Sequence, residues 1–134
     1  MSLSFRDLVA GQKAQRLAVQ VYERTEGFPK SETYGLTSQT RRAAVSIVSN
    51  IAEGQGRLTP GEFQQFLGNS RGSLLELETQ LEIAFDLKLL DSSDESLMQG
   101  CYQVLGLVNR LIESLGKKRR PMQPNPSKRE TLKL

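Results

Sequence analysis

The sequence predicts an all-α protein, an antiparallel up-down-up-down four-helix bundle. Three observations lead to this prediction. Apolar residues recur every three or four positions in four successive segments, short turn-forming stretches separate these segments, and no segment shows the strict alternation of a strand. With 134 residues and 37% hydrophobic content, the chain has room for one domain with one core, expected over residues 1–116.

The first two helices are expected over about 7–27 and 37–54. The first ends where Gly27 and Pro29 interrupt it, and the second begins at a capping Thr37 or Ser38 and stops at Gly54. Their predicted core faces are Leu8, Ala14, Leu17, Ala18, Val21 and Tyr22 in the first helix, and Ala43, Ala44, Ile47, Val48 and Ile51 in the second.

The third helix is expected over about 60–89. Thr59 is a good N-cap, Pro60 fits the first turn, and Glu62 stands in the capping-box position. An unbroken heptad run predicts a long packing seam made of Phe63, Leu67, Ser70, Leu74, Leu77, Leu81, Ala84 and Lys88.

The fourth helix is expected over about 94–115, closed by Gly116. Its apolar face is Leu97, Cys101, Val104, Leu105, Val108, Leu111, Ile112 and Leu115. Because a glycine inside a helix costs up to about 1 kcal/mol relative to alanine, we expect a close backbone approach at Gly100 or Gly106. The alternative is simple tolerance.

The charged residues behind the net charge of +3 are unevenly distributed along the chain. Residues 117–134 carry seven basic groups against one acid, so residues 1–116 are net negative. Within that body, residues 1–57 have 8 basic and 5 acidic side chains and residues 58–116 have 3 and 9, which suits packing between the two halves, within a chain or between chains. Three prolines and no apolar period predict that 117–134 is a disordered basic tail.

Composition excludes most catalytic machinery. Histidine is absent and Cys101 is the single cysteine, which removes Ser/His and Cys/His catalytic pairs, CxxC redox pairs and the common zinc ligand sets. We expect no enzymatic activity, no metal and no cofactor. The position of Cys101 on an apolar stripe predicts a buried thiol, although a reactive one is the alternative. Glu53, Glu76 and Glu78 are the best candidates for carboxylate chemistry.

Neither a membrane span nor a signal peptide is expected. No stretch approaches the roughly 18–20 apolar residues that a span needs, and the N-terminus lacks a basic region followed by an apolar one. The sequence therefore predicts a cytoplasmic protein.

The second and third helices carry a specific family resemblance. Residues 35–54, including Arg41-Arg42-Ala43-Ala44 and Asn50-Ile51-Ala52-Glu53-Gly54, and then residues 62–81 resemble the bacterial proteins encoded by intervening sequences of large-subunit ribosomal RNA genes. The likeness covers most of residues 5–115. It implies a homopentamer of four-helix bundles without known enzymatic activity, distantly like the accessory proteins of diversity-generating retroelements, which associate with a reverse transcriptase and nucleic acid.

Polar residues of the two middle helices form a candidate network. Because arginine prefers bidentate pairing with carboxylates, helix 2 arginines are expected to meet helix 3 glutamates, within a chain or across a subunit boundary. The alternative is a solvated surface, where ion pairs contribute only about 0–1 kcal/mol. The candidate residues for a structural or subunit-interface network are Arg41, Arg42, Asn50, Glu53, Glu76 and Glu78.

Two functions compete at this point. In the first, a non-enzymatic homo-oligomeric adaptor binds RNA or DNA, and a nucleic-acid enzyme such as a reverse transcriptase, through its tails and outward arginines. The residues predicted to contact nucleic acid are Lys117, Lys118, Arg119, Arg120, Arg41 and Arg42. In the second, a protein-only scaffold uses its charge for self-assembly alone. No basic face is expected in the body, whose tyrosines are scattered.

Overall fold

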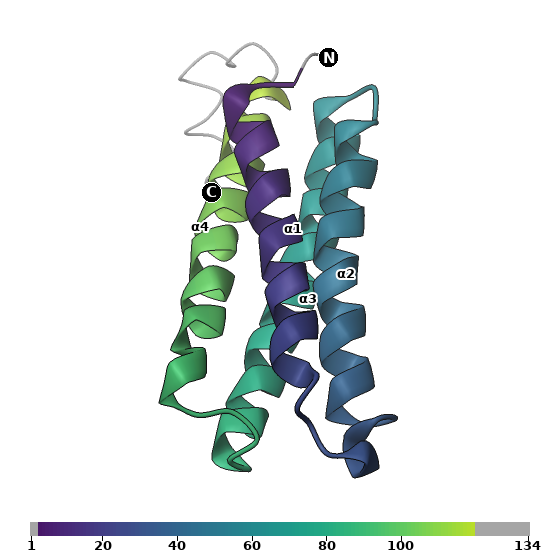
Figure 1. Cartoon of the computed structure of the whole chain (residues 1–134). Helices are drawn as coiled ribbons and strands as arrows, with labels where there is room; N and C mark the ends of the chain where they lie inside the picture. The colour runs from purple at the N-terminus through teal and green to yellow at the C-terminus, as the bar shows by residue number, and fades with distance from the viewer. Residues whose placement is uncertain (1–2, 120–134) are drawn as a thin grey trace, which may run out of the picture.

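The computed structural model describes residues 3–119, whose regular structure is helical (Figure 1). Its elements are α1 (Phe5–Thr25), a 3₁₀ turn η1 (Lys30–Glu32), α2 (Leu36–Gln55), α3 (Pro60–Asp86), a second 3₁₀ turn η2 (Ser92–Asp94) and α4 (Glu95–Arg119). Each α-helix packs on the next one along the chain, and α4 returns to pack on α1. The predicted four-helix, up-down arrangement is therefore confirmed.

The core largely matches the apolar faces that the spacing predicts. Ala10 and Leu90 are also buried although they were not predicted, and three predicted positions are exposed. Leu8 and Tyr22 are 48% and 43% exposed, because the buried face of α1 is centred on Ala10, Ala14 and Val21. Lys88 is exposed, since α3 ends before it. The largest fully buried side chains are Phe63, Leu17, Ile47, Ile51, Leu67, Leu74, Leu77, Leu81, Leu97, Val21, Val104 and Val108.

The helix ends differ from the predicted bounds for identifiable reasons. Helix α1 begins two residues before the expected 7, because the Ser4 hydroxyl accepts from the Asp7 amide at 3.3 Å and the Asp7 carboxylate accepts from the Ser4 amide at 2.7 Å. Helix α4 continues through Gly116 to Arg119, so the first three residues of the predicted disordered tail are helical. The rest of that tail, including Arg120, lies outside the described residues.

Helix α3 ends three residues earlier than expected, in a Schellman motif. Lys88 has a φ of 63°, the Leu89 amide donates to the Ala84 carbonyl at 2.9 Å, and the Lys88 amide donates to that of Phe85 at 2.9 Å. A left-handed residue cannot continue a right-handed helix, so this backbone turn ends α3 although the heptad spacing continues to Lys88.

Helices α2 and α3 approach closely through small residues. A Cβ on Gly54 would lie 2.7 Å from Cδ1 of Phe63 and 3.0 Å from Cβ of Phe66. Further along, the Ser70 hydroxyl donates to the Ile47 carbonyl at 2.8 Å, which explains why a serine occupies a fully buried heptad position. The close packing of α2 on α3 therefore requires small residues at these contacts.

Replacing the glycine at this contact tests that condition. Gly54→Ala is expected to lower the free energy of unfolding by about 1–3 kcal/mol because the new methyl group collides with Phe63, outweighing the better helix propensity of alanine. Urea unfolding followed by circular dichroism measures the change. The matched control is Gly106→Ala, where the nearest atom to the added Cβ is 3.9 Å away; it is expected to be neutral or stabilising, and equal effects of the two variants would contradict the close-contact explanation.

The single cysteine is buried in the folded state. Cys101 is 2% exposed, and burial, followed by the nearby Glu78 carboxylate, raises the pKa of its thiol from 9.0 to about 12. Because the thiolate is the nucleophile, iodoacetamide at pH 8 should leave the folded protein unmodified and alkylate it fully once urea unfolds it. Mass spectrometry of both samples checks this; rapid alkylation of the folded chain would show that the thiol is accessible.

Candidate nucleic-acid interface

Helices α1 and α4 enclose a groove lined by basic and amide side chains. On α1, Lys13 and Arg16 line a hollow together with residues of α4, and Arg6 shares a second hollow with Arg110. At the far end, Arg24 is paired with Asp94, the last residue of η2 directly before α4, with 3.0 Å between Nη1 and Oδ1. We call the surface formed by the two hollows the basic groove.

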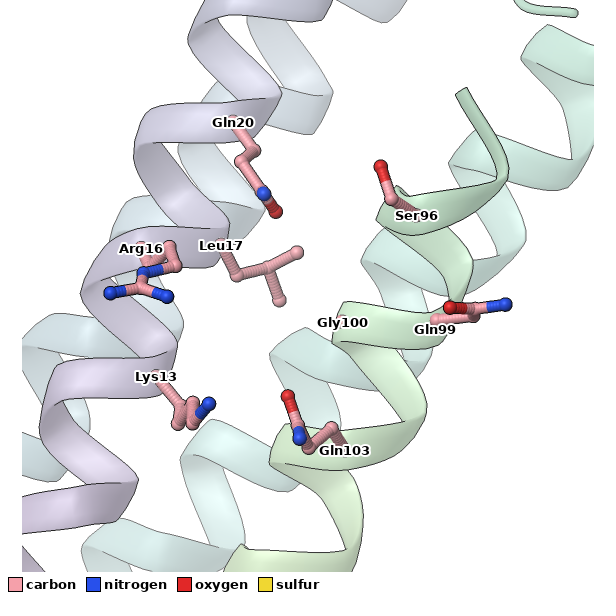
Figure 2. Close-up of a pocket in the computed structure, with 8 residues that line it drawn as sticks. All are labelled: Lys13, Arg16, Leu17, Gln20, Ser96, Gln99, Gly100 and Gln103. Carbon is pink, nitrogen blue, oxygen red and sulfur yellow. The ribbon is translucent and has the colours of Figure 1, made fainter. Parts of the chain in front are cut away.

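The first hollow lies between the middle of α1 and the first turns of α4 and has a volume of about 300 Å³ (Figure 2). Figure 2 shows the Lys13 and Gln103 side chains pointing toward each other from opposite sides of it. It is lined by Lys13, Arg16, Leu17, Gln20, Ser96, Gln99, Gly100 and Gln103. The lining therefore combines two positively charged side chains with several neutral side chains that can form hydrogen bonds.

Gly100 allows α4 to approach α1 closely at the bottom of this hollow. A Cβ on Gly100 would lie 3.0 Å from Cδ1 of Leu17, so α4 comes close to α1 there. At Gly106 the nearest atom would be 3.9 Å away, in ordinary contact. Of the two glycines predicted as sites of close approach, Gly100 is the one where the helices meet tightly.

The second hollow continues the groove toward the end of α4. It has a volume of about 290 Å³ and is lined by Arg6, Leu107, Arg110 and Leu111. Beyond it, Lys117 and Lys118 are exposed on the last turn of α4, at the same end of the bundle as the start of α1 (Figure 1). The described residues that line the two hollows include no acidic side chain.

Acidic side chains gather on the other side of α4, against α3. The pKa of the Tyr102 hydroxyl is raised by partial desolvation and then by the carboxylates of Glu78 and Glu82. Because Glu78 also lies near Cys101, it faces α4 and is turned away from α2. Positive and negative charge thus occupy different flanks of the bundle.

Arg41, predicted both as a network and a phosphate-binding residue, contacts the end of α1 within the chain. Its guanidinium donates to the Thr25 hydroxyl at 3.0 Å and the Tyr22 carbonyl at 3.2 Å, pairs with Glu26 at 3.2 Å, and stacks over the Tyr22 ring at 4.6 Å. These contacts tie α2 to the C-terminal turn of α1. Within the chain, Arg41 therefore pairs with a glutamate that precedes α2 and not with one on α3.

The other predicted network residues are dispersed. Arg42 and Glu76 line a common hollow of about 440 Å³ between α2 and α3. Asn50 donates to the Ser46 carbonyl at 2.8 Å, and Glu53 pairs with Arg57 of the following turn at 2.7 Å. Contacts across a subunit boundary remain a prediction for all of these residues.

The basic groove was missed at the sequence level because its two walls come from opposite ends of the chain. A signal existed: Arg6, Lys13 and Arg24 recur at helical spacing on one flank of the α1 core face. Sequence periodicity alone does not reveal which helix lies beside that flank. The tertiary structure places Lys13 and Arg16 beside α4 and Arg6 beside Arg110, a grouping that the sequence did not predict.

The described part of the chain offers neither a cluster of metal ligands nor a membrane helix. In residues 3–119, no group of three or more potential acidic, cysteine or histidine ligands is arranged to hold a metal ion. No helix in the same range is long and apolar enough to cross a membrane.

Comparison with known proteins places the chain in a family. The model of the 23S rRNA-intervening sequence protein family matches residues 6–110. Among solved structures, the chain resembles the crystal structure of a protein of unknown function from the S23 ribosomal protein family of Bacteroides thetaiotaomicron. The TM-score is 0.75 at 20% identity, covering 81% of this chain and 99% of that one, a likeness that concerns the fold. No curated protein matches.

The four-helix fold and a family match that extends from the second residue of α1 into α4 agree with the resemblance seen in residues 35–54 and 62–81. The chain belongs to the 23S rRNA-intervening sequence protein family.

Proposed function

We propose that this protein is a non-enzymatic, homo-oligomeric adaptor that binds nucleic acid along its basic groove. The observation that supports this proposal is the acid-free lining of the two hollows between α1 and α4, which contains Lys13, Arg16, Arg6 and Arg110. Lys117 and Lys118 extend the same positive surface at the end of α4.

The groove has the chemistry of a phosphate-binding surface. Lysine and arginine neutralise phosphates, and glutamine and serine side chains donate hydrogen bonds to phosphate and sugar oxygens. No aromatic residue lines either hollow in the described structure, so bases have no stacking platform there. The expected contact is with the phosphate backbone and is therefore tolerant of base sequence.

Assembly would multiply this weak site. We propose a homopentamer, as the family resemblance implies, in which several grooves act on one polynucleotide. Linked sites raise the effective concentration of the second contact, so overall binding can exceed that of one groove by orders of magnitude. A nucleic-acid enzyme such as a reverse transcriptase is the proposed protein partner.

A protein-only scaffold is the second candidate. It is favoured by the apolar side chains that α1 exposes to solvent, among them Phe5 and Val19 at 81% and 51% exposure. This function requires self-assembly and predicts no affinity for polynucleotides. Binding measurements therefore separate the two candidates.

Reversing two charges in the groove tests the proposal. The double variant Lys13→Glu with Arg16→Glu is expected to weaken binding to a random-sequence RNA by about tenfold or more and to reduce the slope of log affinity against log salt by about 2. Fluorescence anisotropy at several salt concentrations measures both quantities.

The matched control changes the same charge elsewhere. Lys30 and Lys88 are exposed on the loop after α1 and at the end of α3, so Lys30→Glu with Lys88→Glu should retain near-normal binding. An equal loss in both double variants would indicate a general charge effect, and the absence of binding by the unmodified protein to RNA or DNA would leave only the scaffold.

A shortened chain separates the groove from the tail. Residues 120–134 include four of the basic groups on which the sequence-based hypothesis depends. A chain ending at Arg119 is expected to keep salt-dependent RNA binding, somewhat weakened, because the groove and Lys117 and Lys118 remain. The same anisotropy titration checks this; complete loss of binding would assign the activity to the tail.

A further inference from the structure

Helix α1 carries a second, largely apolar seam that faces solvent. Its members alternate in spacing of three and four residues, the pattern of a packing face, yet they lie away from the core. Four of the six are apolar or aromatic, and two glutamines stand in the middle. Leu8 and Val19 are 48% and 51% exposed in the described structure. We call this set the outer seam; it comprises Phe5, Leu8, Gln12, Gln15, Val19 and Tyr22.

The outer seam continues onto α2. Tyr22 and Val45 line a common hollow of about 540 Å³, which also contains Arg41 and Arg42. Val45 is 42% exposed. An exposed group of apolar residues with charged residues around it is typical of a protein interaction site. The face is separate from the basic groove, because it continues onto α2 and the groove lies on the α4 side of α1.

Helix α3 presents a complementary outward face. Leu75 and Ile83 are 40% and 45% exposed, opposite to the buried heptad seam. Gly68 and Gly72 precede these two residues on the same face, and because glycine has no side chain, the helix surface does not protrude there. A Cβ on either glycine would meet no atom within 4 Å, so the space above both is open. We call this face the α3 stripe; it comprises Gly68, Gly72, Leu75, Thr79 and Ile83.

Charge at the edges of the two faces is predominantly of opposite sign, with Glu23 beside the seam and Arg71 beside the stripe as the exceptions. Arg42 beside the outer seam, and Glu76, Glu82 and Asp86 beside the α3 stripe, form no ion pair within residues 3–119, and Arg42 and Glu76 line one hollow of the same chain. Arginine and carboxylate groups that lack ion-pair partners at the edges of two apolar faces would meet if the faces came together. This is the arrangement in which the predicted arginine–glutamate pairs would form between subunits.

We propose that the outer seam of one copy, with Val45, docks onto the α3 stripe of a second copy. The proposal rests on the homo-oligomeric state in the proposed function and specifies its interface. A ring with more than two subunits needs two unlike surfaces on every chain, since identical surfaces pair off as dimers. The bulky residues of the seam fit against the low glycine surface of the stripe, and each chain offers both faces.

Two single substitutions test this interface. Val19→Glu alters the seam and Leu75→Glu alters the stripe, and each introduces a carboxylate at a side chain that the monomer already exposes. Both variants should fall from the oligomeric mass of the unmodified protein to the mass of one chain, measured by light scattering coupled to size exclusion. Val45→Glu is a second seam variant, and circular dichroism verifies that all variants remain helical.

A control variant and a mixing experiment test whether the seam of one chain contacts the stripe of the next. Leu58, 84% exposed between α2 and α3, lies on neither face, so Leu58→Glu should keep the full oligomeric mass. Mixing the Val19→Glu and Leu75→Glu chains should yield a dimer of one copy of each, because together they retain one intact seam and one intact stripe.

Several results would overturn the interface. If helical variants of both faces keep the full mass, the docking surface lies elsewhere. If only the seam variants dissociate, the seam pairs with itself and the head-to-tail contact is wrong. A monomeric unmodified protein would reject the homo-oligomer of the proposed function as well, whereas loss of assembly in the seam variants leaves RNA binding by single chains to be measured independently.

Discussion

The close contact between the first and last helices governs both proposed surfaces. Leu17 of α1 meets α4 at Gly100, where a side chain would have its Cβ 3.0 Å from the leucine methyl group. This contact places Lys13 and Arg16 beside the amide-rich flank of α4 and so creates the basic groove. It also orients α1, so that the residues opposite its core face are directed to solvent as the outer seam.

Basic and acidic side chains lie on different sides of the bundle, because each helix turns one flank to one neighbouring helix and the other flank to the other. The flank of α1 next to α4 is basic, whereas Glu78 and Glu82 of α3 face the far side of α4 near Tyr102. A phosphate backbone bound in the proposed groove would therefore meet cations, because the described residues that line the two hollows include no carboxylate. The arginines of α2 lie outside these hollows: Arg41 contacts the end of α1, and Arg42 lines the hollow that holds Tyr22 and Val45.

Helix identity and most of the core could be predicted from sequence because local spacing decides which side chains a helix can bury together. Thr59 and Pro60 also marked the start of α3 correctly. Predictions failed where backbone geometry intervened, as at Lys88, whose left-handed conformation ends α3 although the heptad pattern continues. They also failed at Leu8 and Tyr22, whose apolar character indicated a core and whose orientation leaves them exposed.

By itself, the sequence determined the helical class and the family, because composition and residue order carry that information directly. Tertiary structure alone decided which flanks face each other. Arg6 and Arg110 are more than a hundred positions apart, and no periodicity places them in one hollow. Only the return of α4 onto α1 brings them together, since the pairing of distant helices depends on how all four fill one core.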